Sequence, residues 1–382
     1  MRVYKISTGL NDCARDTARV KKEGGATVKS TKEFEMVECR GTPYEIGLQC
    51  GKGCKQNISK AMELTFGGLS FLNNTTKEII IANTMKLLPN VKEFDPDLID
   101  MLKGQADGAS LSFEEVFTLK CGYDLGAYYS KLSGLCTSFA VTGNATRDGK
   151  TLLGQNIDWF PGTPMDLLKI TYADGSEQLS LVLWGIVEYT LNSNGFGICA
   201  NGTWAAEEKY LFNIPVGCYI SKAMRQNTIE DAMGVLRTNA RGIGYYHLAS
   251  AGGEMVGIES IQDDYQVLLP EKDVLVHSNH YLIERFKEVD MVNDLVPDSP
   301  KRFETISRLI DQHYGQITPE IMMEIMADHY NHPYSICRHV DETTPPQFHS
   351  ETLCSFIMIP ENRTMLIAYG NPCKYEYIKY QL

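Results

Sequence analysis

The sequence contains no long apolar run. None of its hydrophobic stretches approaches the roughly 20 consecutive residues that a membrane-spanning helix needs. The amino-terminal segment, MRVYKISTGLNDCARD, becomes polar and charged where the apolar part of a secretory signal would continue. We therefore predict a protein that is neither embedded in a membrane nor exported, and we expect it in the cytoplasm.

Positive charge is also scarce. Lysine and arginine total 36 residues against 48 aspartates and glutamates, which gives a net charge of -12. Bulk electrostatic attraction will not bring such an acidic chain to nucleic acid or to anionic lipid. The sequence also lacks a Gly-rich loop or a basic cluster that would demand a phosphate ligand. We therefore expect small-molecule partners, with no nucleic acid and no membrane.

Paired cysteines are absent. The eleven cysteines are odd in number, scattered, and never arranged as Cys-x-x-Cys. This pattern argues against both a disulfide framework and a zinc ribbon. Cys50 and Cys54 lie four residues apart on an apolar helical stripe, but they lack two further ligands at a suitable spacing. We therefore expect mostly buried, reduced thiols, with no bound metal and no cofactor.

The composition is that of a folded globular protein. With 43% hydrophobic and 22% charged residues in 382, the chain has enough apolar material for a large core. The sequence shows neither an internal repeat nor a low-complexity linker. Residues 1–33 carry many charges, a Gly-Gly pair and little periodicity, which predicts an amino-terminal arm. We expect residues 34–382 to form one domain.

Two kinds of hydrophobic pattern divide this domain. Helical spacing predicts helices over 44–65, 76–88, 95–109, 113–129, 214–238, 299–312 and 318–329, and Ser112 and Glu115 form a capping-box pattern before the fourth. Residues typical of strands recur over 34–38, 136–143, 150–158, 166–173, 178–192, 195–202, 244–250, 255–260, 265–269, 273–277, 353–360, 364–370 and 375–380. Helices flanking so many consecutive strands favour α+β architecture, a four-layer α/β/β/α sandwich of two mainly antiparallel sheets.

One cysteine stands out by its position. Cys136 opens the first core strand directly after Gly134-Leu135, and two hydroxyl residues, Thr137 and Ser138, follow it. A thiol at the tip of a strand, behind a flexible glycine, is exposed enough to react. Cys136 is therefore a candidate nucleophile.

Polar residues interrupt other apolar segments. Gln155, Asn156 and Asp158 lie within an apolar strand, and buried polar groups of this kind need hydrogen-bond partners. Asn279 follows the end of another apolar strand, and Arg338 is a charge within an otherwise uncharged stretch. These residues are candidates for a polar site.

Each candidate also has a structural interpretation. Cys136 can be one more buried thiol, and Asp158 a turn or cap residue. Asn279 can cap the following helix, and Arg338 can pair with Asp341. Taken singly, the structural interpretations are favoured, so the argument for chemistry depends on the joint occurrence of these residues.

The order of these segments resembles that of one enzyme family. Seven segments carry the resemblance and together span nearly everything after residue 34: RGTPYEIGLQCG, LCTSFAV, TLLGQNIDW, NGFGICANG, HSNHYL, SICRHVD and YGNPC. The family is that of the self-processing cysteine N-terminal nucleophile (Ntn) hydrolases typified by isopenicillin-N acyltransferase, or acyl-coenzyme A:6-aminopenicillanate acyltransferase. The resemblance implies the same α/β/β/α fold.

The resemblance further implies that the chain cuts itself between Leu135 and Cys136, into fragments 1–135 and 136–382. Cys136 would then be the nucleophile, and its own freed α-amino group would serve as the base. Family members usually cut a Gly-Cys bond, whereas Leu135 precedes the cysteine here. Glycine eases the backbone geometry of this step, so leucine can slow it. We still predict cleavage, because Thr137, Ser138 and Asp158 match the family pattern.

The family motifs also imply roles for other positions. Asp158 would accept a hydrogen bond from the α-ammonium group, Asn279 would donate to the oxyanion of the tetrahedral intermediate, and Arg338 would lower the pKa of the thiol. Supporting positions are Thr137, Ser138, Gln155, Asn156, Asn201 and Ser335. Three aromatic residues offer a surface for an apolar acyl chain, although they can equally be core residues: Trp159, Phe160 and Trp204.

These assignments predict an acyltransferase or amidohydrolase that forms a thioester on Cys136 and passes the acyl group to an amine or to water. A coenzyme A thioester is one candidate acyl donor. One alternative is a choloylglycine-hydrolase-like or N-acyl amide hydrolase, but those relatives usually expose the nucleophile after losing a methionine or a short propeptide. The other alternative is a non-catalytic protein with a vestigial site. The sequence identifies neither the acyl donor nor the amine acceptor, and it is compatible with a homo-oligomer.

Overall fold

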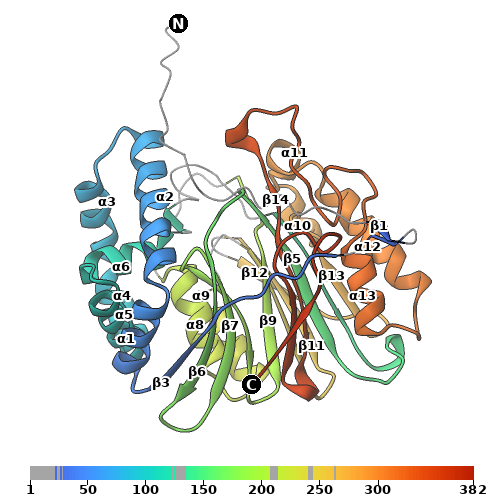
Figure 1. The fold of residues 1–382 in the computed structure, drawn as a ribbon, viewed down its shortest axis with the longest axis horizontal. Coiled ribbons are helices and arrows are strands. Elements are labelled where there is room, and N and C mark those ends of the chain that lie inside the picture. Colours follow the sequence, from blue (N-terminus) through green and yellow to red (C-terminus); the bar gives the residue numbers. More distant parts are fainter. Residues whose placement is uncertain are drawn as a thin grey trace, which may run out of the picture.

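The computed structural model describes residues 29–122, 124–125, 135–206, 214–239, 244–261 and 264–382, together with the short strands β1 (Lys22–Glu23) and β2 (Ala26–Thr27). Two large sheets lie face to face, and helices cover the outer side of each (Figure 1). The predicted four-layer sandwich is therefore confirmed. Residues 1–21 of the predicted arm, 1–33, lie outside the described residues.

The first sheet has eight strands in the order β12-β11-β10-β9-β8-β7-β6-β3, antiparallel except for the parallel pair β3 and β6. Its strands are β3 (Met36–Gly41), β6 (Met165–Tyr172), β7 (Glu177–Leu183), β8 (Val187–Asn192), β9 (Phe196–Asn201), β10 (Gly244–Ser250), β11 (Met255–Ile261) and β12 (Asp264–Leu268). The predicted strand 178–192 is two strands, because the chain reverses at Trp184 and Gly185, whose φ angles are 57° and 67°. Two consecutive left-handed residues turn a hairpin.

The second sheet has six antiparallel strands in the order β13-β4-β5-β14-β15-β16. Its strands are β4 (Leu135–Val141), β5 (Leu152–Trp159), β13 (Val274–His277), β14 (Glu351–Ile359), β15 (Thr364–Ala368) and β16 (Ile378–Gln381). The strand β4, whose second residue is the candidate nucleophile, is thus held between β13 and β5. Its two neighbours come from parts of the chain more than 100 residues apart, 152–159 and 274–277.

Helices form the two outer layers. The described helices are α1 (Pro43–Gly53), α2 (Lys55–Asn73), α3 (Lys77–Thr84), α4 (Leu88–Phe94), α5 (Pro96–Ala109), α6 (Phe113–Lys120), α8 (Val216–Met224), α9 (Ile229–Asn239), α10 (Glu284–Lys287), α11 (Val292–Leu295), α12 (Ser299–Gln312) and α13 (Pro319–Met326), with short 3-10 helices at Met85–Leu87, Gly143–Ala145, Pro346–Phe348 and Pro360–Asn362. The predicted capping box of Ser112 and Glu115 is confirmed at the start of α6. The predicted helix 44–65 is two helices that meet at Cys54. None of the described helices is both long enough and apolar enough to cross a bilayer.

Helices α1 and α5 approach each other unusually closely. Gly47 and Gly51 of α1 face Gly104 and Gly108 of α5, and a Cβ atom on any of the four would collide with the backbone of the other helix. The absence of side chains therefore sets the distance between the two helices, as in other contacts between small residues. This pair anchors the helical layer on the eight-stranded sheet.

Side chains of β4 alternate between the two sides of the six-stranded sheet, as a strand requires. Phe139 and Val141 pack with α12 and α13, whereas Ala140 belongs to the core between the sheets. By the same alternation Cys136 faces the other sheet and Thr137 faces α12. The tip of β4 therefore contributes groups to both sides of its sheet.

Candidate active site

Cys136 lies near the start of β4, directly opposite Ile157 of β5, and its neighbour Leu135 lies opposite Asp158. Only 2% of the surface of Cys136 is exposed. The expectation of an exposed thiol at the strand tip is therefore wrong, because neighbouring strands pair with β4 on both sides and the second sheet covers it. The thiol is reached through a pocket between the sheets.

This pocket encloses about 550 Å³, including its open mouth. It is mainly apolar and aromatic, and its lining residues come chiefly from β7, β8, β9 and α8: Cys136, Trp159, Leu183, Trp184, Ile186, Val187, Tyr189, Ala200, Asn201, Gly202, Val216, Ile220, Gly244 and Tyr246. Of the three aromatic residues assigned to substrate, only Trp159 lines it. Phe160 packs edge-on against Trp159, and Trp204 is buried elsewhere with 2% of its surface exposed.

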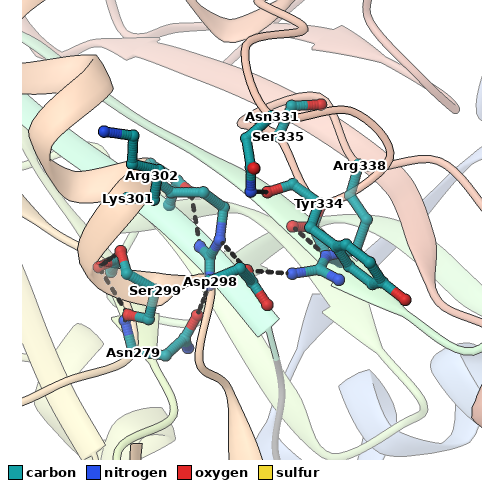
Figure 2. A network of polar contacts seen from close by, with 12 residues as sticks. Asn279, Asp298, Ser299, Lys301, Arg302, Asn331, Tyr334, Ser335 and Arg338 are labelled. Atoms are coloured by element: carbon teal, nitrogen blue, oxygen red, sulfur yellow. Dashed lines mark hydrogen bonds and ion pairs between the residues drawn. The ribbon is translucent and has the colours of Figure 1, made fainter. Parts of the chain in front are cut away.

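Arg302, on α12, is the centre of the polar groups on the other side of the strand (Figure 2). Its Nη1 donates to the backbone oxygen of Cys136 at 2.6 Å and to Oγ1 of Thr137 at 2.8 Å. Its Nη2 donates to Oδ1 of Asn279 at 2.6 Å. The guanidinium group, 1% exposed, thus fixes the backbone of the candidate nucleophile and the candidate oxyanion residue together.

Asn279 contacts the candidate nucleophile directly. Its Oδ1 accepts a hydrogen bond from the backbone N–H of Cys136 at 2.9 Å. Its Nδ2 donates to the backbone oxygen of Gly202, a pocket residue, at 2.9 Å, and its own N–H donates to Oγ of Ser299 at 2.7 Å. The side-chain amide therefore lies between the backbone nitrogen of Cys136 and the wall of the pocket.

Two carboxylates and two arginines form a chain of buried charges, and Figure 2 shows three of them: Asp298, Arg302 and Arg338. Asp298 bridges them, since its Oδ2 accepts from Arg302 Nε at 2.7 Å and pairs with Arg338 Nη2. Nε of Arg338 lies 3.6 Å from Oδ2 of Asp158, whose Oδ1 accepts from Oγ1 of Thr352 at 2.6 Å. Among the described residues, Oδ2 of Asp158 accepts no hydrogen bond. The structure thus brings Asp158, Asn279 and Arg338 into one network with the backbone of Cys136.

Burial dominates the titration of the thiol. Burial raises the pKa of Cys136 to about 12, and the negative charge of Asp158 adds to the rise. The backbone N–H of Asp158, the side chain of Gln155 and the charge of Arg302 act in the opposite direction. In the continuous chain the thiol is therefore protonated at neutral pH.

The two carboxylates differ. Burial raises the pKa of Asp158 to about 6, against the opposing charges of Arg338 and Arg302 and the hydrogen bond from Thr352. For Asp298, burial acts in the same direction, but Arg302 and Arg338 outweigh it and its pKa is lowered. Asp298 is therefore the permanent anion of the network, and Asp158 can change its protonation state near neutral pH.

The structure places a second arginine beside Cys136, and the role predicted for Arg338 stays a prediction. The charge of Arg302 lowers the pKa of the Cys136 thiol, and the charge of Arg338 lowers the pKa of Asp158 and Asp298. The reason is the alternation of side chains, because α12 places Arg302 against the backbone of Cys136 while Arg338 lies beside the neighbouring strand. Arg338 belongs to the site, but it acts through the carboxylates.

Three supporting residues connect the site to its surroundings. Thr137 accepts from Arg302. Gln155 bridges the two sheets, since its Nε2 donates to the oxygen of Ala200 at 2.8 Å and its Oε1 accepts from the N–H of that residue at 3.1 Å. Nδ2 of Asn156 donates to two backbone oxygens on the helical side, at 2.9 and 2.8 Å.

The other supporting residues vary in their closeness to the site. Asn201 lines the pocket with Cys136, and its Nδ2 donates to the backbone oxygen of His277 at 3.3 Å. The hydroxyl of Ser138 is buried and has no hydrogen-bond partner among the described residues. Ser335 donates to the oxygen of Cys337 at 2.6 Å and makes none of the hydrogen bonds that hold Cys136.

Several residues of this region are missing from the sequence-based prediction. Arg302 and Asp298 were not singled out, because charges on a helix usually face solvent. One signal was available, since Arg302 lies four and eight residues before Ile306 and Ile310 and therefore on the buried stripe of α12. The prediction also missed a cluster of histidines and cysteines on both sides of Arg338 in the sequence.

Comparisons with known proteins agree with the motif-based resemblance. The family model described as "Acyl-coenzyme A:6-aminopenicillanic acid acyl-transferase" matches residues 145–374, which is more than half of the chain and includes Asp158, Asn279 and Arg338. The acyl-coenzyme A:6-aminopenicillanic-acid-acyltransferase 40 kDa form of Emericella nidulans is 24% identical over 353 residues, covering 88% of this chain and 92% of that protein. An uncharacterized protein of Archaeoglobus fulgidus is 23% identical over 370 residues, covering 83% of this chain and 61% of that one.

Solved structures include more distant likenesses. A variant of conjugated bile acid hydrolase from Clostridium perfringens has a TM-score of 0.42 and 13% identity, covering 65% of this chain and 97% of that one. Penicillin V acylase from Agrobacterium tumefaciens has a TM-score of 0.42 and 14% identity, covering 61% of this chain and 83% of that one. The sequence match to the family model identifies the chain: it belongs to the acyl-coenzyme A:6-aminopenicillanic acid acyl-transferase family.

Proposed function

We propose that this protein is an acyl-transfer enzyme that activates itself by cutting its chain before Cys136. In the first step the sulfur of Cys136 bonds to the carbonyl carbon of Leu135, the C–N bond breaks, and the thiol proton ends on the released amine. Water then hydrolyses the thioester, which frees the carboxylate of Leu135 and restores the thiol. The products are a chain ending at Leu135 and a chain beginning with Cys136.

The observation that carries this proposal is the hold on the Cys136 backbone. Its nitrogen is fixed by Asn279 at 2.9 Å and its oxygen by Arg302 at 2.6 Å, while its side chain faces the pocket. Cleavage converts that nitrogen into an α-amine that Asn279 already orients. An ordinary packed cysteine needs no such arrangement of buried charges around its peptide group.

The freed amine supplies the base that the site requires. A thiol with a pKa near 12 is protonated at neutral pH, so it attacks a substrate only if a neighbouring group removes its proton. An α-amine has a pKa of about 7.7 to 8.0 and belongs to the same residue. The oxygen Oδ2 of Asp158 accepts no hydrogen bond from the described residues, and we assign it to the α-ammonium group that forms when the proton arrives.

Two amides are suited to stabilise the tetrahedral intermediate. We assign the oxyanion to Asn279, whose Nδ2 lies at the wall of the pocket beside Gly202, with Asn201 as the second candidate because it lines the same pocket. In other acyl-transfer enzymes the loss of one such donor costs about 2.7 to 4 kcal/mol. The same cost is expected here for a side chain that acts in this way.

The pocket indicates the kind of acyl group. Its aromatic and aliphatic lining, with few polar groups, suits an apolar acyl chain. We propose that the acyl donor is an N-acyl amide or a coenzyme A thioester, and that the thioester on Cys136 passes its acyl group to an amine or to water. The related Emericella protein, by its name, acts between acyl-coenzyme A and 6-aminopenicillanic acid.

A mass-spectrometric assay tests the proposal. The protein is incubated with N-acyl amides and acyl-coenzyme A thioesters of increasing chain length, and an acyl adduct is sought on the fragment beginning at Cys136. The Cys136→Ala variant should give no adduct, whereas Cys199→Ala, a neighbouring buried thiol outside the pocket lining, should keep it. Turnover by the Cys136→Ala variant would refute the assignment. The absence of any adduct on the wild-type protein would favour the vestigial alternative.

A further inference from the structure

Two histidines and two cysteines converge near the carboxyl-terminal end of the chain. His329 follows α13, Cys337 and His339 lie in the next segment, and Cys373 lies between β15 and β16. One ligand atom from each residue lies within 4.8 Å of every other. Cys337 is buried, Cys373 and His339 are partly buried, and His329 is exposed, so the cluster can be reached from solvent.

The spacing of these atoms fits one small tetrahedral cation. Zinc bonds to sulfur and nitrogen at about 2.3 and 2.0 to 2.1 Å imply tetrahedral edges of about 3.8 Å between sulfurs, about 3.6 Å between sulfur and nitrogen and about 3.3 Å between nitrogens. The two sulfurs are 3.6 Å apart. Nε2 of His339 is 3.6 and 3.5 Å from the sulfurs of Cys337 and Cys373, and 3.0 Å from Nε2 of His329. Four of the six edges therefore come within about 0.3 Å of the expected figure, and the two from His329 to the sulfurs lie within 4.8 Å.

We propose that His329, Cys337, His339 and Cys373 bind one Zn²⁺ ion. Two thiolates and two imidazoles are the ligand set of structural zinc sites, and four protein ligands leave no open position for a reacting water. The two cysteines bind as thiolates and release their protons to solvent. The site holds the chain in place and takes no part in the chemistry at Cys136.

The geometry also distinguishes this site from a disulfide. The sulfurs of Cys337 and Cys373 are 3.6 Å apart, well beyond a covalent bond of about 2.05 Å, and both are free cysteines. Two imidazole nitrogens point into the same small space as the two sulfurs. A cation at the centre gives all four groups a common partner.

The zinc ion would fix the position of Arg338. This arginine lies between the ligands Cys337 and His339 in the sequence, and its backbone oxygen accepts from Nδ2 of Asn371 at 2.8 Å, two residues before the ligand Cys373. Its backbone N–H donates at 2.9 Å to Thr352, the residue that also donates to Asp158. The metal therefore joins two segments whose common task is to hold Arg338 beside Asp158. Arg338 is a positioning residue, and zinc is its support.

Metal analysis of the full chain tests the inference. Protein purified without chelator and then supplied with Zn²⁺ should contain about one zinc per chain, as four ligands bind one ion. Replacing zinc by Co²⁺ should give the sulfur-to-cobalt charge-transfer band and the strong visible bands of a tetrahedral site. Cys373→Ser and His329→Asn should each lose stoichiometric zinc, whereas the matched controls Cys50→Ser and His313→Asn should retain it.

A chelator experiment on the unchanged protein covers the case in which a variant fails to fold. Removal of zinc should lower the thermal midpoint, because the ion binds only the folded site, and added Zn²⁺ should restore it. A chain without zinc after Zn²⁺ is supplied, zinc retained by Cys373→Ser, or a Cys337–Cys373 disulfide in place of the metal would overturn the inference. None of these readouts depends on self-cleavage or on activity, so the proposed function stands or falls separately.

Discussion

Replacing Arg302 by leucine tests whether the buried charge network holds the site together. Arg302 makes four contacts at once, to the backbone of Cys136 and to the side chains of Thr137, Asn279 and Asp298. The leucine would fill much of the space but would remove the Arg302 donors to the Cys136 oxygen and to Oγ1 of Thr137, whereas Oδ1 of Asn279 would keep the Cys136 N–H as its donor. Asp298 would keep Arg338 as its partner.

The magnitude follows from this arrangement. A charge-assisted hydrogen bond contributes about 1.5 to 3 kcal/mol, but the four are not additive, since removing the guanidinium also removes the cost of burying it. Breaking a buried ion pair by deleting one partner typically costs 3 to 5 kcal/mol, so we expect a loss of about 3 to 5 kcal/mol in the free energy of unfolding. For 382 residues the unfolding entropy is about 0.8 kcal/mol/K, so the thermal midpoint should fall by about 4 to 6 °C.

Differential scanning calorimetry measures this fall, and intact-mass analysis of the same samples measures self-cleavage, which should slow because the Cys136 backbone loses its anchor. Arg308→Leu is the matched control, because Arg308 lies on the same helix but is exposed. Arg302→Lys should recover part of the stability, since it restores the charge without the forked geometry. Equal midpoints for Arg302→Leu and Arg308→Leu would refute the reasoning.

Three further predictions concern single substitutions. Burial raises the pKa of Asp158 from 3.8 to about 6, so the stability that its protonated form contributes is complete below pH 3.8 and is lost as pH rises through about 6. Relative to wild type, Asp158→Asn should therefore gain about 3 kcal/mol in the free energy of urea unfolding between pH about 4 and 7. A difference between the two proteins that stays constant with pH would contradict this. Gly104→Ala should destabilise the protein by about 1 to 3 kcal/mol, because the added Cβ collides with the backbone of α1. The control Gly67→Ala adds a Cβ that meets nothing within 4 Å and should stabilise the protein by about 0.5 to 1 kcal/mol. Equal thermal midpoints for the two variants would contradict the packing argument. Tyr246→Ala should raise the KM of long acyl donors more than that of acetyl donors if the pocket binds the chain, and a uniform change would argue against it.

The layers and the members of the polar site followed from local patterns. Period-two alternation along 136–143 and 150–158 predicted buried strands, and polar residues inside such strands had to find partners, which is why Asp158 was found. The contacts between these residues could not be predicted in this way. Arg302 is 166 residues from Cys136, and only the packing of α12 on the sheet brings them together. The contact between Arg302 and Cys136 could not be predicted for this reason.

The burial of Cys136 and the proposed zinc site were harder still to predict. The burial of Cys136 depends on the other sheet, which covers it, and no local pattern near residue 136 reveals this packing. The four proposed zinc ligands come from segments up to 44 residues apart, from His329 to Cys373, without a Cys-x-x-Cys pair. Ligand spacing in a sequence identifies a metal site only where the ligands share one short loop.

Intact-mass analysis combined with amino-terminal sequencing tests the central claim most directly. The account predicts two polypeptides in the purified protein, the second beginning Cys-Thr-Ser-Phe at Cys136, and a single uncut chain for Cys136→Ala. The two masses should sum to the 42.8 kDa of the intact chain plus one water. A single uncut species that persists after long incubation and is as inactive as Cys136→Ala would contradict the account.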